Sequence, residues 1–246
     1  MREQPEQQAP PVQRLRIRYA KRGRLRFASH RDFSRAFERA LVRAGVPMAY
    51  SSGFNPHPRI SYAGAAPTGA ASEAEFLEIG LARESEPDDV RSALDTALPP
   101  GLDVLEVVTS HGGSLADRLE ASSWRIRVPG ADPETAGVAV ASFLATDELL
   151  VERMTKKGLR SFDCRAAVVT LRVGESRPDE GPCAILEVVL RHSTPSVRPD
   201  DVLAGLREVS GLEAGSAALS ERLAQGPLDE QTGTVGDPLA PDRDAV

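Results

Sequence analysis

Arginine recurs at every fourth position from residue 31 to residue 43, within a segment that also has the apolar spacing of an amphipathic helix. At this spacing the guanidinium groups share one helix face and repel one another slightly unless an anion is bound. Guanidinium groups pair well with phosphate, so this face is a candidate phosphate-binding surface, with a merely solvated face as the alternative. The residues concerned are Arg31, Arg35, Arg39 and Arg43.

The start of the same segment carries a second set of polar residues. Ser29 precedes the segment and Asp32 follows three residues later, which is the pattern of a capping box. Because free amides at a helix start bind anions, Ser29, His30 and Arg31 are also candidates for holding a phosphate, with simple capping as the alternative. His30 would then be placed for acid or base chemistry on a bound RNA.

A third set of candidates lies in the loop Gly53-Phe54-Asn55-Pro56-His57-Pro58. The two prolines hold the backbone of His57 extended and display its imidazole beside Phe54 and Asn55, as suits a contact residue. The alternative is a loop that is only stiffened. No carboxylate is fixed beside His57 by the sequence, so no catalytic residue is assigned, and His30 and His57 are the candidates if the chain is an enzyme. Nearby cationic candidates for substrate binding are Arg24, Arg26 and Arg59.

A further basic cluster spans residues 153–160 and includes Lys156 and Lys157. It is either a solvated hairpin tip or a second contact for a polyanion. The aromatic residues that alternate with basic residues in the first part of the chain are typical of proteins that stack the bases of single-stranded RNA, although they could equally belong to the core. These aromatic residues are Tyr19, Phe27, Tyr50 and Phe54.

The basic residues are concentrated near the N-terminus. Residues 1–61 contain 13 Lys and Arg against 4 Asp and Glu, whereas the whole chain of 246 residues has a net charge of −6. A basic region on an acidic body favours oriented contact with a polyanion or an acidic protein. We find no metal, iron–sulfur, dinucleotide or phosphate-loop motif and no membrane span, so the sequence predicts a cytoplasmic protein with no cofactor, no membrane contact and two free thiols.

The positions of these candidates depend on the predicted elements. Apolar residues alternate with arginines over residues 14–19 and again over 24–27, which predicts strands with the arginines on one solvent face. With a helix from Ser29 to Gly45, the order that follows is β-α-β-β-α-β, the ferredoxin-like split βαβ arrangement of an α+β fold with an antiparallel sheet. The remaining predicted elements of this part are strands at 48–50, 59–62, 75–81 and 102–108 and a helix at 88–98.

A second unit with a similar order of elements follows. We predict strands at 123–128, 149–154, 164–173 and 184–190 and helices at 133–144 and 199–209. The chain therefore divides into a basic N-terminal ferredoxin-like domain at 14–112 and a second α+β domain at 113–220. Low apolar content predicts disordered tails at 1–13 and 221–246.

Several motifs resemble those of one known family. The motifs are the run from Arg14 to Asp32, the segment Tyr50 to Ser61, Pro67-Thr68-Gly69, Ser72-Glu73, and Thr155 to Gly158 followed by Asp163 and Arg165. Together they resemble the radical-SAM-linked family, a domain of unknown function, in its stand-alone form. More distantly, the first half resembles the ferredoxin-like RNA-processing endonucleases of CRISPR systems.

The family resemblance implies a function as well as a fold. A stand-alone member lies beside a separate radical-SAM enzyme, and the genes of the family tend to lie near those of a ribonuclease and of ribosomal proteins. The chain is therefore expected to be a non-catalytic accessory protein that binds or presents an RNA substrate linked to tRNA or rRNA. Two alternatives stay open, namely a metal-independent RNA-processing endonuclease of ferredoxin-like fold and a module that only docks a protein.

Overall fold

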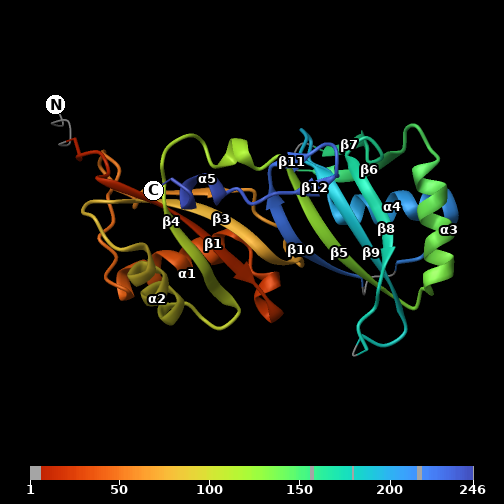
Figure 1. The fold of residues 1–246 in the computed structure, drawn as a ribbon, viewed down its shortest axis with the longest axis horizontal. Helices are drawn as coiled ribbons and strands as arrows, with labels where there is room; N and C mark the ends of the chain where they lie inside the picture. The colour runs from red at the N-terminus through yellow and green to blue at the C-terminus, as the bar shows by residue number, and fades with distance from the viewer. Residues whose placement is uncertain (1–6, 156–157, 179, 215–217, 246) are drawn as a thin grey trace. The chain divides into compact units, whose positions relative to one another are not determined.

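The computed structural model describes residues 7–155, 158–178, 180–214 and 218–245. The chain forms two compact units, one made of Met1–Arg118 with Pro238–Val246 and the other of Leu119–Asp237. The first unit therefore contains both ends of the chain (Figure 1). Its elements are β1 (Gln13–Lys21), the 3-10 helix η1 (Gly23–Phe27), α1 (His30–Arg43), β2 (Ile60–Ala63), β3 (Ala71–Leu81), α2 (Pro87–Ala97), β4 (Leu102–Thr109), the 3-10 helix η2 (Ala116–Arg118) and α5 (Ala240–Arg243).

The strands of the first unit lie in the order β4-β1-β3-β2, and every neighbouring pair is antiparallel. This is the order of a ferredoxin-like sheet built from two split βαβ units. Leu15, Ile17 and Tyr19 of β1 face the helices α1 and α2, which bring Phe37 and Leu94 into the same core. The intervening residues of β1 point to the opposite face because side chains alternate along a strand.

The second unit repeats this topology. Its strands lie in the order β10-β5-β9-β8, again with antiparallel neighbours, and the hairpin of β6 and β7 is inserted between α3 and β8. The predicted fold class, α+β with two ferredoxin-like units, is confirmed. The elements are β5 (Ala121–Pro129), α3 (Pro133–Leu144), β6 (Leu150–Thr155), β7 (Gly158–Asp163), β8 (Val168–Gly174), β9 (Cys183–Arg191), α4 (Pro199–Ser210), β10 (Leu219–Gly226), β11 (Leu228–Asp229) and β12 (Thr234–Val235).

The ends of the helices follow from local chemistry. The Asp132 carboxylate accepts a hydrogen bond from the Thr135 amide at 2.8 Å, and Pro133 occupies the first position of α3, so this helix has the predicted bounds. A different helix, α4, ends at Gly211, which adopts a left-handed conformation with φ of 71°. Such a residue ends a helix readily because glycine has no Cβ to clash in that conformation.

Three predicted strands differ from the structure. Residues 24–27 form the 3-10 helix η1 because the chain turns at Gly23, with φ of 54°, and the Leu25 amide donates to the Arg22 carbonyl. Residues 48–50 make only isolated bridges. The predicted strand at 164–173 contains a turn before β8, and β7 precedes it. Cys164 and Cys183 are buried and free, as predicted.

The prediction of a disordered C-terminal tail is wrong for the described residues. The strand β10 pairs with β5, and α5 is held to the first unit by ion pairs. Both are stabilised by backbone and charged partners, which apolar periodicity does not reveal. Of the predicted N-terminal tail, residues 1–6 lie outside the described residues, whereas the Val12 amide donates to the Leu81 carbonyl at 2.8 Å. Over the described ranges, no helix is long and apolar enough to cross a membrane.

Candidate functional site

The outer face of α1 carries the row of arginines predicted from the sequence. Phe33 and Phe37 lie on the inner face of this helix and are buried in the core, whereas the arginines lie on the opposite face and are exposed to solvent. Among the described residues, the side chains of Arg31, Arg35 and Arg39 form no hydrogen bond or ion pair. Three guanidinium groups on this exposed face of α1 are thus available for an anion. We call the face that carries Arg31, Arg35 and Arg39 the basic face.

The fourth arginine of the row is partly committed to the fold. Arg43 donates from Nη2 to the carbonyl oxygen of Ala97 at 2.6 Å, at the end of α2. A cation at the end of a helix interacts favourably with the helix dipole and with the unpaired carbonyl groups there. Arg43 therefore joins α1 to α2 and contributes fewer free donors to the basic face than the other three.

The start of α1 is occupied by the chain's own carboxylate. The Asp32 amide donates to Ser29 Oγ at 3.2 Å, and Asp32 Oδ2 accepts from the Ser29 hydroxyl at 2.6 Å and from the Ser29 amide at 3.2 Å. The predicted capping box is confirmed. Hydrogen bonds from Ser29 lower the pKa of Asp32, so this carboxylate is charged and would repel a phosphate at the helix start.

His30 is exposed on the first turn of α1. Its ring meets the ring of Tyr62 edge-on, with centroids 4.7 Å apart. Burial raises the pKa of Tyr62. Within the described part of the chain, the imidazole of His30 has no hydrogen-bond partner that would orient it as a general acid or base.

The loop before β2 is closed at its base by backbone bonds. The Ser51 amide donates to the His57 carbonyl at 2.8 Å, and the His57 amide donates to Ser51 Oγ at 3.0 Å. Arg59 donates from Nε to the Tyr50 carbonyl at 3.1 Å and so stiffens the same base. The loop consequently presents Phe54, Asn55 and His57 to solvent, and Phe54 is 68% exposed.

The predicted site residues fall into two groups along β2. Arg24 and Arg26 lie on η1, directly before Ser29 and His30, and Tyr62 brings β2 to this group. The second group lies in the loop at residues 53–58, which directly precedes the start of β2 at Ile60. His30 and His57 are thus placed in different groups, with the arginines of α1 extending away from the first.

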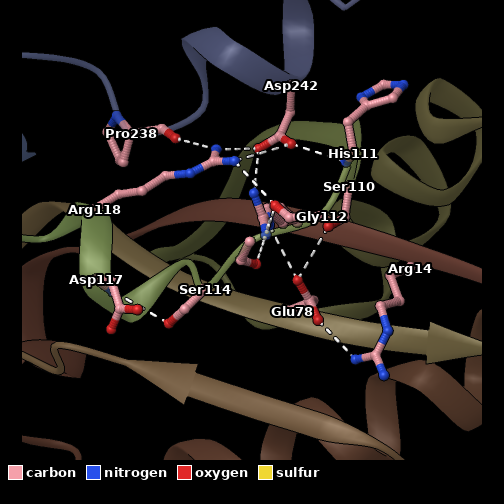
Figure 2. A network of polar contacts seen from close by, with 12 residues as sticks. Arg14, Glu78, Ser110, His111, Gly112, Ser114, Asp117, Arg118, Pro238 and Asp242 are labelled. Carbon is pink, nitrogen blue, oxygen red and sulfur yellow. Dashed lines mark hydrogen bonds and ion pairs between the residues drawn. The ribbon is translucent and has the colours of Figure 1, made fainter.

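The prediction that the arginines of β1 line one solvent face is wrong for Arg16, whereas Arg14 is exposed. Arg16 is completely buried, and its partners Asp242, Glu78 and Gly112 are labelled in Figure 2. It donates to Asp242 at 2.6 Å and to Glu78 at 3.0 Å, and also to the carbonyl oxygens of Gly112 and Gly113 at 2.9 and 2.6 Å. The segment that contains α5 contacts Arg16 through Asp242, so Arg16 is part of the structure rather than of the basic face.

A second arginine completes this buried network. Arg118 donates to Asp242 at 2.5 Å and to the Pro238 carbonyl at 2.9 Å (Figure 2). Burial would raise the pKa of Asp242, but hydrogen bonds from the His111 amide, Arg118 and Arg16 outweigh it and lower the pKa. No local pattern around Asp242 indicates this role, because its partners are distant in the sequence.

The sequence of the chain matches one known protein family. Residues 14–199 match the profile of a family described as "Uncharacterized protein conserved in bacteria (DUF2344)". The chain belongs to this family. No curated protein matches the chain.

Among solved structures, the chain is similar to a chain of the "Crystal Structure of a Cbf5-Nop10-Gar1 Complex", at 10% identity and a TM-score of 0.46. The similarity covers 91% of this chain and 55% of that one, so our chain spans about half the length of the structure it matches.

The DUF2344 match includes both basic clusters and ends before β10 and α5. In the second cluster, Lys156 and Lys157 lie outside the described residues. Arg153 pairs with Asp201 and stacks over Phe162 at 4.6 Å from the ring centroid. Arg153 therefore attaches the β6–β7 hairpin to α4 through Asp201. The candidate surface that the described residues define is the one on η1 and α1.

Proposed function

We propose that this protein is an accessory protein, without a catalytic site of its own, that binds RNA and presents it to a radical-SAM enzyme on a separate chain. The observation that carries the proposal is the exposed, unpaired state of Arg31, Arg35 and Arg39 on one helix face. Like charges repeated at this spacing destabilise a helix slightly, and a bound phosphate backbone would relieve the repulsion.

RNA is favoured over a small phosphorylated ligand by the shape of this surface. At about 1.5 Å per residue, the arginines of α1 extend along the helix and suit a chain of phosphates rather than one phosphate. The capping carboxylate of Asp32 already occupies the helix start, where a single phosphate would otherwise bind. The same unit also exposes the aromatic rings of Phe27 and Phe54, on which bases could stack.

The radical-SAM partner is inferred from the motifs shared with the radical-SAM-linked family. The chain has two cysteines, both buried as free thiols, and burial raises the pKa of Cys164 to about 12. A cluster that needs several thiolate ligands would therefore have to be held by the partner.

The RNA contact is tested by fluorescence anisotropy with a labelled single-stranded RNA at several salt concentrations. We expect the Arg35→Gln/Arg39→Gln variant to bind more weakly and to lower the slope of log K against log salt by about 1.4, for two lost phosphate contacts at about 0.7 each. A matched control is Arg83→Gln/Arg207→Gln, which removes two exposed arginines outside the basic face. Equal loss in both variants would show that binding reflects overall charge only.

The accessory role is tested on material purified from the native cell with tagged protein. Intact RNA and a radical-SAM protein should co-purify with the wild type, and the Arg35→Gln/Arg39→Gln variant should lose the RNA while keeping the protein. If the purified chain instead cleaves RNA in the presence of a chelator, and His30→Ala abolishes cleavage, the accessory role is wrong. If neither the wild type nor the Arg35→Gln/Arg39→Gln variant carries RNA, the RNA-binding proposal is wrong and the basic face serves a protein contact.

A further inference from the structure

The turn before α1 fixes one aromatic residue in a defined position. The Leu25 amide donates to the Arg22 carbonyl at 3.1 Å, and the Ala28 amide donates to the Leu25 carbonyl at 2.9 Å. The Gly69 amide donates to the Arg26 carbonyl at 2.8 Å and ties the turn to the loop before β3. The backbone on both sides of Phe27 is therefore held in place before any ligand arrives.

The side chain of Phe27 is not used by the core. It is 59% exposed, whereas Tyr19, Phe33 and Phe37 of the same unit are buried and stack on one another. The guanidinium carbon of Arg26 lies 4.8 Å from the centroid of the Phe27 ring. One face of the ring thus contacts a cation, and the exposure of the residue leaves the ring open to a second planar group.

The hydrogen-bonding groups around this ring are incompletely used. Arg26 Nε is buried without a hydrogen-bond partner in the described structure. Arg24, on the same turn, is exposed and its side chain forms no ion pair with any described residue. Arg22, by contrast, pairs with Glu73 and Asp103 and anchors the turn. Arg26 therefore contacts the ring, Arg24 lies on the same turn, and neither side chain forms an ion pair with a described carboxylate.

We propose that Phe27 stacks an unpaired base, with Arg26 on the opposite face of the ring and Arg24 on the adjoining phosphate, so that the basic face selects single-stranded RNA. This inference rests on the proposed RNA-binding function and names its substrate class. Bases in a double helix are stacked on each other and cannot reach a protein ring, whereas unpaired bases can. Stacking on a rigid ring is tolerant of sequence, because every base has a planar face.

The test compares three labelled ligands of equal length by anisotropy: a single-stranded RNA, the duplex of the same sequence, and the same backbone with abasic sugars. Wild-type protein should bind the single strand about tenfold more tightly than the abasic backbone, the size expected for one stacked base. Phe27→Leu should remove this preference, lower single-strand affinity about tenfold, and change duplex affinity and the salt slope little. Phe27→Trp, which keeps a planar ring, should restore single-strand affinity.

The outcomes separate this inference from the function on which it rests. If Phe27→Leu binds the single strand as the wild type does, or weakens the single strand and the duplex equally, stacking at Phe27 is wrong, while loss of binding by Arg35→Gln/Arg39→Gln would still support the RNA contact. If the wild type binds none of the three ligands, the RNA-binding function itself fails. Because the abasic ligand is compared on wild-type protein, the preference for bases is measured even if a variant folds poorly.

Discussion

Asp242 accepts hydrogen bonds from Arg16, Arg118 and the His111 amide while its side chain is fully enclosed. A buried carboxylate is tolerated because these donors replace the water it has lost. Arg16 and Arg118 both donate to this carboxylate, and Arg16 also donates to Glu78 on the neighbouring strand β3. Loss of the Asp242 carboxylate would leave the buried Arg16 guanidinium with excess positive charge that solvent does not reach.

We expect Asp242→Asn to lower the free energy of unfolding by about 3 kcal/mol, the usual size when one partner of a buried ion pair is removed. Urea denaturation at neutral pH measures this loss. Asp244→Asn is the matched control, because Asp244 is exposed in the same segment. A similar loss in both variants would contradict a specific role for the buried carboxylate.

The same carboxylate predicts a pH dependence. The folded pKa of Asp242 lies below its ordinary value of 3.8, so its contribution to stability is complete above that value and is lost as the pH falls through the folded pKa. The stability difference between wild type and Asp242→Asn should therefore narrow under strongly acidic conditions. Urea midpoints measured from pH 6 downward check this.

His192 predicts a second pH dependence, in the second unit. Its Nδ1 lies 2.7 Å from the Leu119 carbonyl oxygen and its Nε2 lies 3.2 Å from Ser122 Oγ, while the Trp124 indole donates to the same Oγ. These contacts suit the neutral ring, with Nδ1 donating and Nε2 accepting. Burial lowers the pKa of His192 below its ordinary value of 6.5.

Because the unfolded chain takes up a proton at this position at a higher pH than the folded chain, stability should fall as the pH drops below 6.5. We expect His192→Gln to show a shallower decline over this range than the wild type. His111→Gln, a variant of an exposed histidine, should keep the wild-type decline. Parallel curves for the wild type and His192→Gln would overturn this assignment.

At the scale of the elements, α3 and α4 pack closely through Gly205. A Cβ added at this position would lie 2.8 Å from Leu149 Cδ2 and 2.9 Å from Phe143 Cε2. Real Cβ atoms do not approach other atoms so closely, so the neighbouring side chains would have to shift. The glycine therefore sets the distance between α3 and α4 in the second unit.

Gly205→Ala should lower the free energy of unfolding by about 1 kcal/mol, because an overpacking penalty of about 1 to 3 kcal/mol exceeds the gain of about 1 kcal/mol in helix propensity. Gly137→Ala, on α3, should have the opposite sign, since a Cβ there meets nothing within 4 Å. Chemical denaturation of the two variants side by side tests the pair. Stabilisation by both would show that the packing is loose.

For the whole molecule, the second unit is an insertion in the chain of the first. The first unit ends at Arg118 and resumes at Pro238, and the Arg118 side chain donates to the Pro238 carbonyl at that point. We expect deletion of residues 238–246 to raise amide hydrogen exchange in β1 and β4 and to leave β5 and β9 unchanged. Hydrogen-exchange mass spectrometry distinguishes this from a uniform increase, which would contradict two separately stabilised units.

The elements that could be predicted are those specified by neighbouring residues. The Asp132 cap with Pro133 gives the start of α3, and the alternation of Leu15, Ile17 and Tyr19 gives the buried face of β1. The candidate site on α1 was equally predictable, since it depends on the spacing of residues within one helix.

The remaining features depend on residues that are far apart in the sequence. The burial of Arg16 requires Asp242, which contributes no local signal, and the strand β10 is stabilised by pairing with β5. The exposure of Phe27, which the proposed stacking requires, also depends on the tertiary structure, because its sequence pattern is that of a core residue of a strand. Local patterns do not contain this information.

The position of α5 after the second unit in the chain affects the order in which the two units are synthesised. The ribosome synthesises Arg16 early, and its partner Asp242 appears only 226 residues later. By then all of Leu119–Asp237 has been translated, so the second unit can finish folding while the first still lacks its last element. Nascent chains usually complete their N-terminal domain first. Here the order is reversed, and the unit that carries the basic face becomes complete only after the second unit has been translated.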